Sequence, residues 1–217
     1  MKKTIDQILE EFSEIQGEIT RFTNNVKEFF EDDKTKTNDD LPLIHSIKFR
    51  IKDKEHLKEK LERKWTSYEG ITSKNFTDKI TDLGGVRVFH LYPDQFTHIH
   101  EKIMKQIAQK NWALFESPKA YTWDPELNSS FEKLDIEVSF NERYYTSVHY
   151  VVKPHSTSPY TCEIQVRTLF EEIWGEIDHS INYPSPTVNI AQKEQLKVLA
   201  KLVVTGTTLA NSIFRSK

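Results

Sequence analysis

Positively charged side chains gather in residues 48–64, KFRIKDKEHLKEKLERK, which hold eight Lys or Arg against four Asp or Glu. Arg50 and Lys52 would point to the same side of a strand, and Lys60 follows Lys52 by about two helical turns. Guanidinium and ammonium groups placed in this way can hold polyphosphate oxygens, and an arginine can also stack flat on a nucleobase. A solvated, salt-bridged helix face would carry the same charges, so this segment alone leaves both interpretations open.

Two acidic residues stand where they could hold a metal ion or act as a base. Asp82, in ITDLGGVRV (80–88), precedes a glycine pair and a β-rich run, which places it at the mouth of a strand. In TCEIQVRT (161–168), Glu163, Gln165 and Arg167 share one face of a predicted core strand and need partners or a ligand if they are buried. The ordinary alternatives are a capped turn at Asp82 and an exposed strand face at Glu163.

A third group of residues lies in RYYTSVHYVV (143–152), where period-two alternation places Tyr145, Ser147 and His149 on one face. An aromatic ring, a hydroxyl and an imidazole on one face could hold a base and its ribose or phosphate. The outer face of an ordinary antiparallel strand would show the same pattern.

The composition excludes several other classes of protein. The formal net charge of the 217 residues is −3, which argues against wholesale nucleic-acid binding. The single cysteine, Cys162, excludes a disulfide framework and a multi-cysteine metal site. The apolar runs are too short to span a membrane and the N-terminus lacks the apolar stretch of a signal peptide, so we expect a cytoplasmic protein. The sequence has no P-loop, GxGxxG or HExxH motif and no Ser-His-Asp order.

The elements that must position these residues begin with an amphipathic helix predicted over residues 1–30. Its apolar residues step by three and four and form a seam of the a/d type: Ile5, Ile8, Phe12, Ile15, Ile19, Phe22, Val26 and Phe29. We favour packing within its own chain, with the C-terminal helix as the docking partner, and an oligomer or partner seam is the alternative. A charged linker over residues 31–40 follows.

The rest of the chain alternates between strand-like and helical patterns. Strands are predicted at 46–51, 85–91, 134–140, 145–152 and 160–166, and helices at 52–65, 93–110, 167–180 and 188–217. Residues 111–133 are predicted to be an irregular, aromatic segment. Closely spaced strands between helical segments predict an α+β fold with a mixed or antiparallel sheet.

Taken together, the order and spacing of these motifs resemble the synthetase domain of the RelA/SpoT family. The resemblance rests on RIK with a second lysine eight residues on, DLGGVRV, YTSVH, EIQVRT and a WGEIDH helix, and it covers roughly residues 45–185. It implies one domain over residues 1–217, of the stand-alone small alarmone synthetase type, with a nucleotidyltransferase-like mixed β-sheet flanked by helices. It also implies transfer of the β,γ-pyrophosphate of ATP to the 3′-hydroxyl of GDP or GTP with Mg²⁺, which makes (p)ppGpp.

The resemblance assigns a role to each matching residue. Four basic residues would hold ATP, the first two around the adenine and the others on the phosphates: Arg50, Arg87, Lys52 and Lys60. Asp82 and Glu163 would bind Mg²⁺, with Glu163 also activating the attacking hydroxyl. Three residues would contact the acceptor nucleotide, with the first stacked on its base: Tyr145, His149 and Gln165.

The chain departs from the family pattern mainly on the acceptor side. The family usually has Lys and Gly where Asn141 and Tyr144 stand, and Ser where His56 stands. The acceptor therefore stays open, because some toxic relatives pyrophosphorylate adenine nucleotides or the 3′-CCA end of tRNA. A catalytically silent nucleotide-binding regulatory module is the alternative of another class, although a silent copy has no chemical need for both Asp82 and Glu163. A second copy of the chain or a neutralising antitoxin is also left open as a protein partner.

Overall fold

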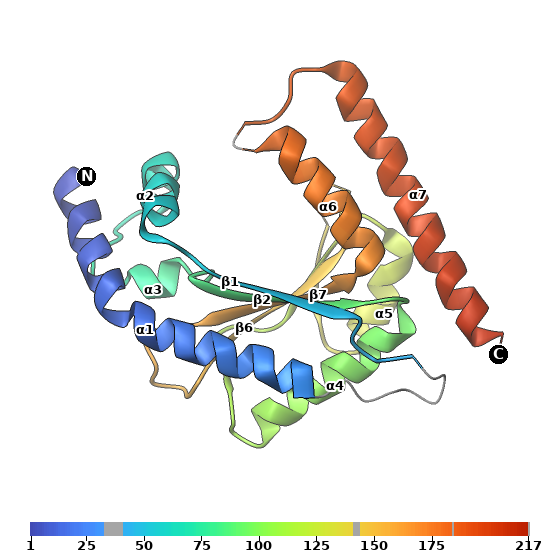
Figure 1. Ribbon diagram of the computed structural model, residues 1–217, viewed down its shortest axis with the longest axis horizontal. Helices are drawn as coiled ribbons and strands as arrows, with labels where there is room; N and C mark the ends of the chain where they lie inside the picture. Colours follow the sequence, from blue (N-terminus) through green and yellow to red (C-terminus); the bar gives the residue numbers. More distant parts are fainter. Residues whose placement is uncertain (33–40, 141–143, 184, 217) are drawn as a thin grey trace.

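A seven-stranded mixed sheet forms the middle of the molecule in the computed structural model, which describes residues 1–32, 41–140, 144–183 and 185–216 (Figure 1). The strand order is β1-β2-β7-β6-β4-β5, and β3 pairs with β6 outside this path. The strands are β1 (Ser46–Ile51), β2 (Gly84–His90), β3 (Ala113–Leu114), β4 (Lys119–Thr122), β5 (Glu137–Phe140), β6 (Ser147–Lys153) and β7 (Cys162–Thr168). The central pair, β2 and β7, runs parallel, and each of the two also pairs with an antiparallel neighbour. The predicted α+β class, with a mixed sheet flanked by helices, is confirmed.

Helices lie on both sides of this sheet. They are α1 (Lys2–Asp32), α2 (Lys54–Arg63), α3 (Phe76–Lys79), α4 (Asp94–Ala108), α5 (Asn128–Glu132), α6 (Leu169–Asn182) and α7 (Ile190–Arg215), with 3-10 turns η1 (Trp65–Ser67) and η2 (Pro125–Leu127). The start of α2 is fixed by Asp53, whose side chain accepts the His56 N–H, as the sequence predicts for an N-cap. No helix in the described part of the chain has both the length and the apolar character needed to cross a bilayer.

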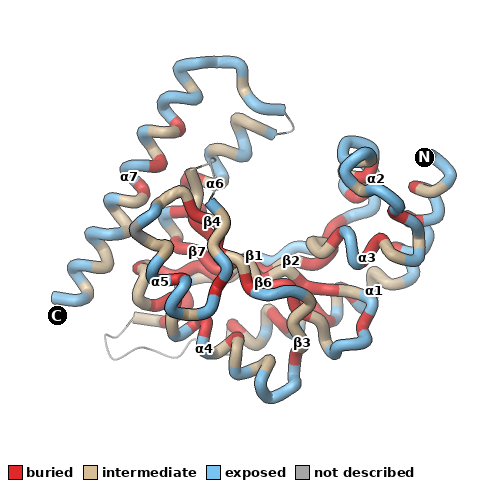
Figure 2. The backbone as a smooth tube through the Cα atoms, turned by 180° about the vertical axis from the view of Figure 1, so that it is seen from behind, coloured by how far each residue is buried: buried red, intermediate tan, exposed pale blue. Residues whose placement is uncertain are grey.

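One face of the sheet is sealed by helices. Alternate residues of β2, β6 and β7 point to this face and are buried there with apolar side chains of α1, α4 and α5. Figure 2 shows the burial concentrated in the sheet and on the inward sides of these helices, while most of α7 is exposed. Because side chains alternate along a strand, the polar residues of the same strands lie on the opposite face of the sheet. Helices cover this face only in part.

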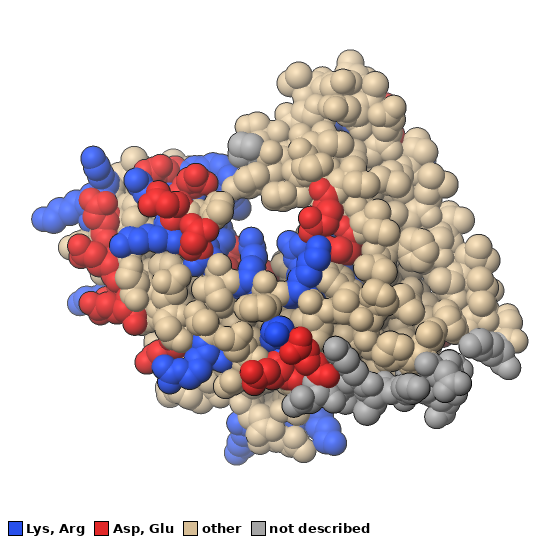
Figure 3. All heavy atoms as spheres, viewed as in Figure 1, with Lys and Arg blue, Asp and Glu red and all other residues tan. Residues whose placement is uncertain are grey.

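The opposite face is flanked by two groups of helices. Figure 1 shows α2 above one end of the sheet and α6 with α7 above the other. Figure 3 shows an opening between these two sides, with basic and acidic side chains gathered at its edges. The polar residues of the strands therefore face a space that a substrate can enter.

The N-terminal seam packs within its own chain, but its partner differs from the predicted one. Apart from Ile15 and Phe29, which are half-buried, the predicted seam residues are buried. Helix α1 packs on α2 and on β1, β2 and β7, whereas the C-terminal helix α7 packs on α6. The sheet offers α1 a wider apolar surface than a single helix does, because the buried residues of neighbouring strands lie side by side on it. The predicted linker falls mostly on residues outside the described ones.

Two local predictions about strands need correction. Residues 111–133 are not irregular throughout, because they contain β3, β4, η2 and α5, and Trp112 and Phe131 are buried in the core below the sheet. The strand predicted at 145–152 begins at Ser147, so Tyr145 lies just before β6. The residue ahead of it, Tyr144, has φ 62°, which interrupts the extended backbone.

The glycine pair begins β2, and the close approach of α1 requires the first of the two. A Cβ on Gly84 would lie 2.1 Å from Oγ1 of Thr23 on α1. Thr23 is fully buried, and its hydroxyl donates to the Ile19 carbonyl oxygen at 2.8 Å, so it cannot move without breaking that bond. By contrast, a Cβ on Gly17, in the middle of α1, would meet no atom within 4 Å.

These two glycines give a matched pair of stability predictions. We expect Gly84→Ala to cost about 1–3 kcal/mol of unfolding free energy through overpacking. Gly17→Ala should instead gain up to about 1 kcal/mol, because alanine favours the helix. Urea unfolding of both variants checks this, and Thr23→Ala should restore most of the loss in Gly84→Ala. Equal stability of the two single variants would contradict this packing of α1 on β2.

Candidate active site

Three basic side chains converge on the carboxylate of Asp82. Lys60 Nζ, from α2, lies 2.7 Å from Oδ1, and Lys52 Nζ, just after β1, lies 3.1 Å from Oδ2. Arg50 Nη2, on β1, lies 3.6 Å from Oδ2. The side chains of Lys52 and Asp82 are 8% and 20% exposed, so they are largely removed from water, whereas Arg50 is exposed at the edge of the cluster. The predicted phosphate-binding lysines and the predicted metal ligand are thus brought together.

The cluster is electrostatically unbalanced. Burial works against ionisation of Asp82, but the Lys60 and Lys52 ammonium groups outweigh it and hold the pKa of Asp82 at about 2. For Lys52, burial dominates and lowers the pKa, with Lys60 and Arg50 acting in the same direction and Asp82 opposing them. Three cations around one carboxylate leave an excess of positive charge that suits a polyphosphate.

A second carboxylate, Glu163, lies on the neighbouring strand β7. Its Oε1 lies 3.1 Å from His149 Nδ1, and its Oε2 accepts a hydrogen bond of 2.7 Å from Gln165 Nε2. Burial tends to raise the pKa of Glu163, but His149 and Gln165 together lower it below its usual range. The nearby negative charge of Asp82 opposes this effect and raises the pKa of Glu163. The strand register pairs His149 with Gln165, so the two predicted polar faces lie side by side on the sheet.

A slot lined by arginines lies above Gly85. Arg50 pairs with Gly85 across the β1–β2 ladder, and Arg87 stands two residues along β2 on the same face. Both line a pocket of 140 Å³ together with Glu163 and Gln165. A Cβ on Gly85 would lie within 3.9 Å of Arg50 Cγ, so the glycine keeps the floor of the slot free. Two guanidinium groups flanking such a floor can hold a flat base between them.

The sequence analysis missed a second carboxylate with three basic partners. Glu172, on α6, lies 2.9 Å from Lys48 Nζ and 3.4 Å from Arg87 Nη1, and it also pairs with Arg167. Glu176, one turn further along α6, lies 3.1 Å from Arg87 Nη1. The i, i+4 spacing of these two glutamates marks one helix face and was the available signal. These ion pairs hold Arg87 on the sheet and fix α6 above it.

The predicted acceptor tyrosine is positioned by α6 and not by the strand. The Tyr145 ring stacks on Trp174 with centroids 6.3 Å apart and planes 18° apart. Tyr144 adopts the left-handed conformation, with φ 62°, that glycine adopts most easily, and the family usually has glycine at this position. The chain therefore has the backbone turn that this glycine allows, with a strained residue in its place. Asn141, the other departure, lies outside the described residues.

The two carboxylates fit Mg²⁺ by their chemistry. Mg²⁺ in proteins takes oxygen ligands, commonly one or two carboxylates together with substrate phosphates and waters. Asp82 and Glu163 supply such oxygens from neighbouring strands at the same end of the sheet. Among the described residues there is no group of three or more His, Cys, Asp or Glu that could bind a metal without a substrate.

Comparison with known protein families assigns the chain. The model of the family described as "Region found in RelA / SpoT proteins" matches residues 49–187, which is more than half of the chain. The chain belongs to the RelA/SpoT family, and the resemblance inferred from its motifs is confirmed. Comparison with curated protein sequences gives no match.

Solved structures share the fold. The small alarmone synthetase 1 from Bacillus subtilis bound to its product pppGpp has a TM-score of 0.66 and 22% identity, covering 91% of this chain and 93% of that chain. The same protein bound to AMPCPP gives 0.64 and 20%, with coverages of 95% and 97%. A GTP pyrophosphokinase family protein from Streptococcus pneumoniae gives 0.61 and 19%, with coverages of 94% and 89%. At these identities the likeness establishes the fold.

The Asp82 cluster predicts a specific loss of stability in acid. The pKa of Asp82 is about 2 in the folded chain against an ordinary 3.8, so its stabilising contribution is complete above pH 3.8 and lost as the pH falls to about 2. The shift corresponds to about 2 kcal/mol. Urea unfolding at a series of pH values should show that Asp82→Asn lacks this loss. Asp78→Asn, at an exposed acid on α3, is the control and should keep the wild-type dependence; parallel curves for the two variants would refute the cluster's role.

Proposed function

We propose that this chain is an ATP-dependent pyrophosphokinase that transfers the β,γ-pyrophosphate of ATP to the 3′-hydroxyl of GDP or GTP. The observation that carries the proposal is the continuity of the site. The arginine-lined slot above Gly85 leads along the sheet to the amino-terminal end of β2 and β7, where the cationic cluster at Asp82 and the Glu163 carboxylate lie close together. A purine, a polyphosphate chain and an attacking hydroxyl can be placed along it in the order that this reaction needs.

On the ATP side, Arg50 and Arg87 hold the adenine between their guanidinium planes. Lys52 and Lys60, now paired with Asp82, turn to the phosphate oxygens and neutralise their charge. Phosphoryl-type transfer depends mainly on such positioning and charge stabilisation, because it needs no covalent nucleophile from the protein. Mg²⁺ held by Asp82 and Glu163 would neutralise further negative charge on the phosphates during transfer.

On the acceptor side, Glu163 is the base for the 3′-hydroxyl. Its lowered pKa keeps it ionised at neutral pH, and His149 and Gln165 fix its two oxygens. His149 is itself held by an edge-on contact with the Tyr121 ring at 4.7 Å. Tyr145 offers its ring to the acceptor base, backed by Trp174. The proton of the attacking hydroxyl passes to Glu163 as its oxygen bonds to the β-phosphorus of ATP, and the bond from that phosphorus to the oxygen shared with the α-phosphate breaks, so that AMP leaves.

Related structures support the choice of nucleotides. The Bacillus subtilis protein of the same fold carries pppGpp in one structure and AMPCPP, an ATP analogue, in another. The deciding experiment is incubation of the purified chain with labelled ATP, Mg²⁺ and one acceptor at a time: GDP, GTP, ATP or tRNA. A labelled guanine nucleotide with release of AMP supports the proposal. Transfer to tRNA or to an adenine nucleotide alone would replace the acceptor, and no AMP in any reaction would refute the enzymatic function.

Removing either carboxylate should stop transfer without unfolding the chain. We expect Asp82→Asn and Glu163→Gln each to lower kcat by at least about 100-fold, the usual contribution of a base or ligand in such a step. Glu101→Gln is the matched control, because Glu101 is an exposed residue of α4, on the face of the sheet away from the site, and the variant should keep wild-type activity. The assay is AMP release at saturating substrates, with circular dichroism as the check on folding. Near-normal turnover of Glu163→Gln would show that Glu163 is not the base in this reaction.

Loss of the Tyr145 ring should affect the acceptor and not ATP. Stacking of a base on an aromatic side chain is worth about 1–3 kcal/mol, so Tyr145→Ala should raise the acceptor KM by about tenfold or more. The KM for ATP should change little. Tyr144→Gly is the neighbouring control: it removes an edge-on contact with Trp123 and relaxes the left-handed φ, and we expect a smaller kinetic effect. Equal weakening of both substrates by Tyr145→Ala would mean that the ring is not the acceptor platform.

A further inference from the structure

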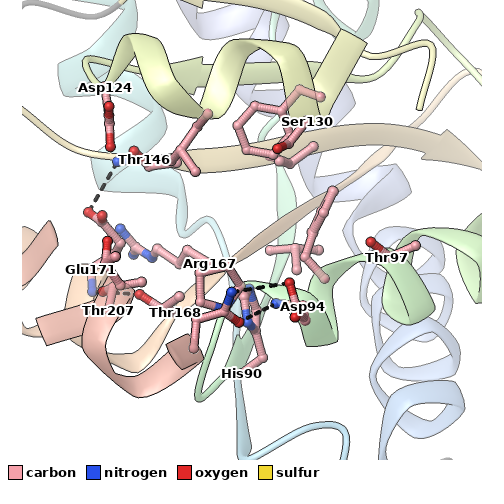
Figure 4. Close-up of a pocket in the computed structure, with 18 of the residues that line it drawn as sticks. His90, Asp94, Thr97, Asp124, Ser130, Thr146, Arg167, Thr168, Glu171 and Thr207 are labelled. Atoms are coloured by element: carbon pink, nitrogen blue, oxygen red, sulfur yellow. Dashed lines mark hydrogen bonds between the residues drawn. The ribbon is translucent and has the colours of Figure 1, made fainter. Parts of the chain in front are cut away.

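A large cavity lies at the end of the sheet away from the candidate active site. We call it the sheet-end cavity: it has a volume of 490 Å³ and lies between the last residues of β2 and β7, His90 and Thr168, and the helices α4, α5, α6 and α7 (Figure 4). Asp82 and Glu163 lie at the opposite, amino-terminal end of the same two parallel strands. None of the roles assigned above uses this cavity.

Its inner wall is apolar and aromatic. Phe96 on α4 and Phe131 on α5 line it, and their rings meet edge to face with centroids 5.6 Å apart. Leu134, Val148 and Val166 complete this wall. A space of this size, with an apolar wall on one side and polar groups around the rest, has the form of a site for a small organic ligand.

Two buried polar atoms of the cavity residues lack a partner. Arg167 Nε and Thr207 Oγ1 are buried and make no hydrogen bond within the described part of the chain. The Arg167 residue is only 9% exposed, and its guanidinium contacts the place where a Cβ on Gly175 would stand, so it is closely packed. Buried polar atoms in native proteins are nearly always bonded. The Arg167 N–H therefore needs an acceptor, and none of the described side chains supplies one.

A buried carboxyl group adds the complementary need for a donor. Glu171 is 4% exposed, and one of its oxygens accepts the Thr146 N–H at 3.1 Å. Burial raises the pKa of Glu171 to about 7, against the opposing effects of the Thr146 N–H and Arg167. A ligand N–H that donates to this carboxylate would compensate its burial. Figure 4 shows Glu171, Arg167 and Thr207 on the same side of the cavity.

The charges inside the cavity favour an uncharged ligand. Arg167 is already paired with Glu172, and Arg215 is paired with Asp94 at 2.6 Å. The lining as a whole carries three acidic side chains, Asp94, Asp124 and Glu171, and three basic ones, Lys133, Arg167 and Arg215, so it presents no excess of either charge to a ligand. A neutral molecule needs only to accept one hydrogen bond and to donate another.

We propose that the sheet-end cavity binds an uncharged nucleoside whose base has a carbonyl oxygen beside a ring N–H, as in guanosine or inosine. The carbonyl oxygen accepts the Arg167 Nε–H, and the ring N–H donates to Glu171, in the manner in which arginine and carboxylate side chains read base edges. The flat base packs against Phe96 and Phe131. The Thr207 hydroxyl provides a further hydrogen bond to the ligand.

Equilibrium dialysis of the full chain against radiolabelled guanosine tests this proposal without any activity assay. We expect one bound guanosine per chain and displacement by unlabelled inosine. Adenosine should compete at least about tenfold less well, because it has an amino group and an unprotonated ring nitrogen in place of the carbonyl and the N–H.

Variants assign the binding to this cavity. Thr207→Val and Glu171→Gln should each weaken guanosine binding by about tenfold or more. Thr205→Val, on the exposed side of α7, is the matched control and should bind as the wild type does. Tyr145→Ala, which removes the proposed acceptor platform, should also bind normally, which separates this cavity from the nucleotide site and makes the result independent of the proposed function. Melting temperatures of all the variants check that they fold.

Three results would overturn the proposal. One is that the wild-type chain retains no guanosine at concentrations up to its solubility. Another is that adenosine competes as well as inosine, which would refute the assigned base edge. The third is that guanosine binding is lost in Tyr145→Ala, or kept in both Thr207→Val and Glu171→Gln, which would place the nucleoside elsewhere.

Discussion

The ion cluster at Asp82 connects parts of the chain that are otherwise separate. Lys60 comes from α2, Lys52 follows β1 and Asp82 precedes β2, so the cluster fixes α2 against the amino-terminal end of the central strand pair. It is also incomplete as an ionic group, since one carboxylate cannot neutralise three cations. The same contacts that hold α2 in place thus leave positive charge available for a polyphosphate, and binding and stability depend on the same side chains.

The arrangement occurs twice on the open face of the sheet. Glu172 on α6 holds three cations, Lys48, Arg87 and Arg167, as Asp82 holds Arg50, Lys52 and Lys60. The Glu172 group fixes α6, and with it α7, above one end of the sheet. The Asp82 group fixes α2 above the other end. Arg50 and Arg87 belong to different groups and flank the same glycine, so the width of the slot between them depends on both. This explains why a charged strand face remains ordered under an opening to solvent.

The sequence predicted what depends on local pattern. Period-two alternation along β7 placed Glu163 and Gln165 on one face, and the a/d seam identified the buried side of α1, because strand and helix geometry alone decides these faces. It failed where a distant partner decides. Strand β6 starts later than predicted because Tyr144 turns the backbone. The partner of α1 is a surface made by separate strands. Glu172 reaches the site only because α6 lies over β2 and β7. The sheet-end cavity has walls from four helices, and no single segment predicts it.

Arg167 shows how the two ends of the strand pair are connected. It lies on β7 two residues beyond Gln165, so its side chain shares the face of the candidate active site, yet it also lines the sheet-end cavity. Its guanidinium pairs with Glu172, and Glu172 also contacts Arg87 in the arginine-lined slot. A hydrogen bond from Arg167 to a ligand in the cavity would change how strongly Glu172 holds Arg87. Because Arg167 and Glu172 are buried, where charges are weakly screened, occupation of one end would alter the electrostatics of the other.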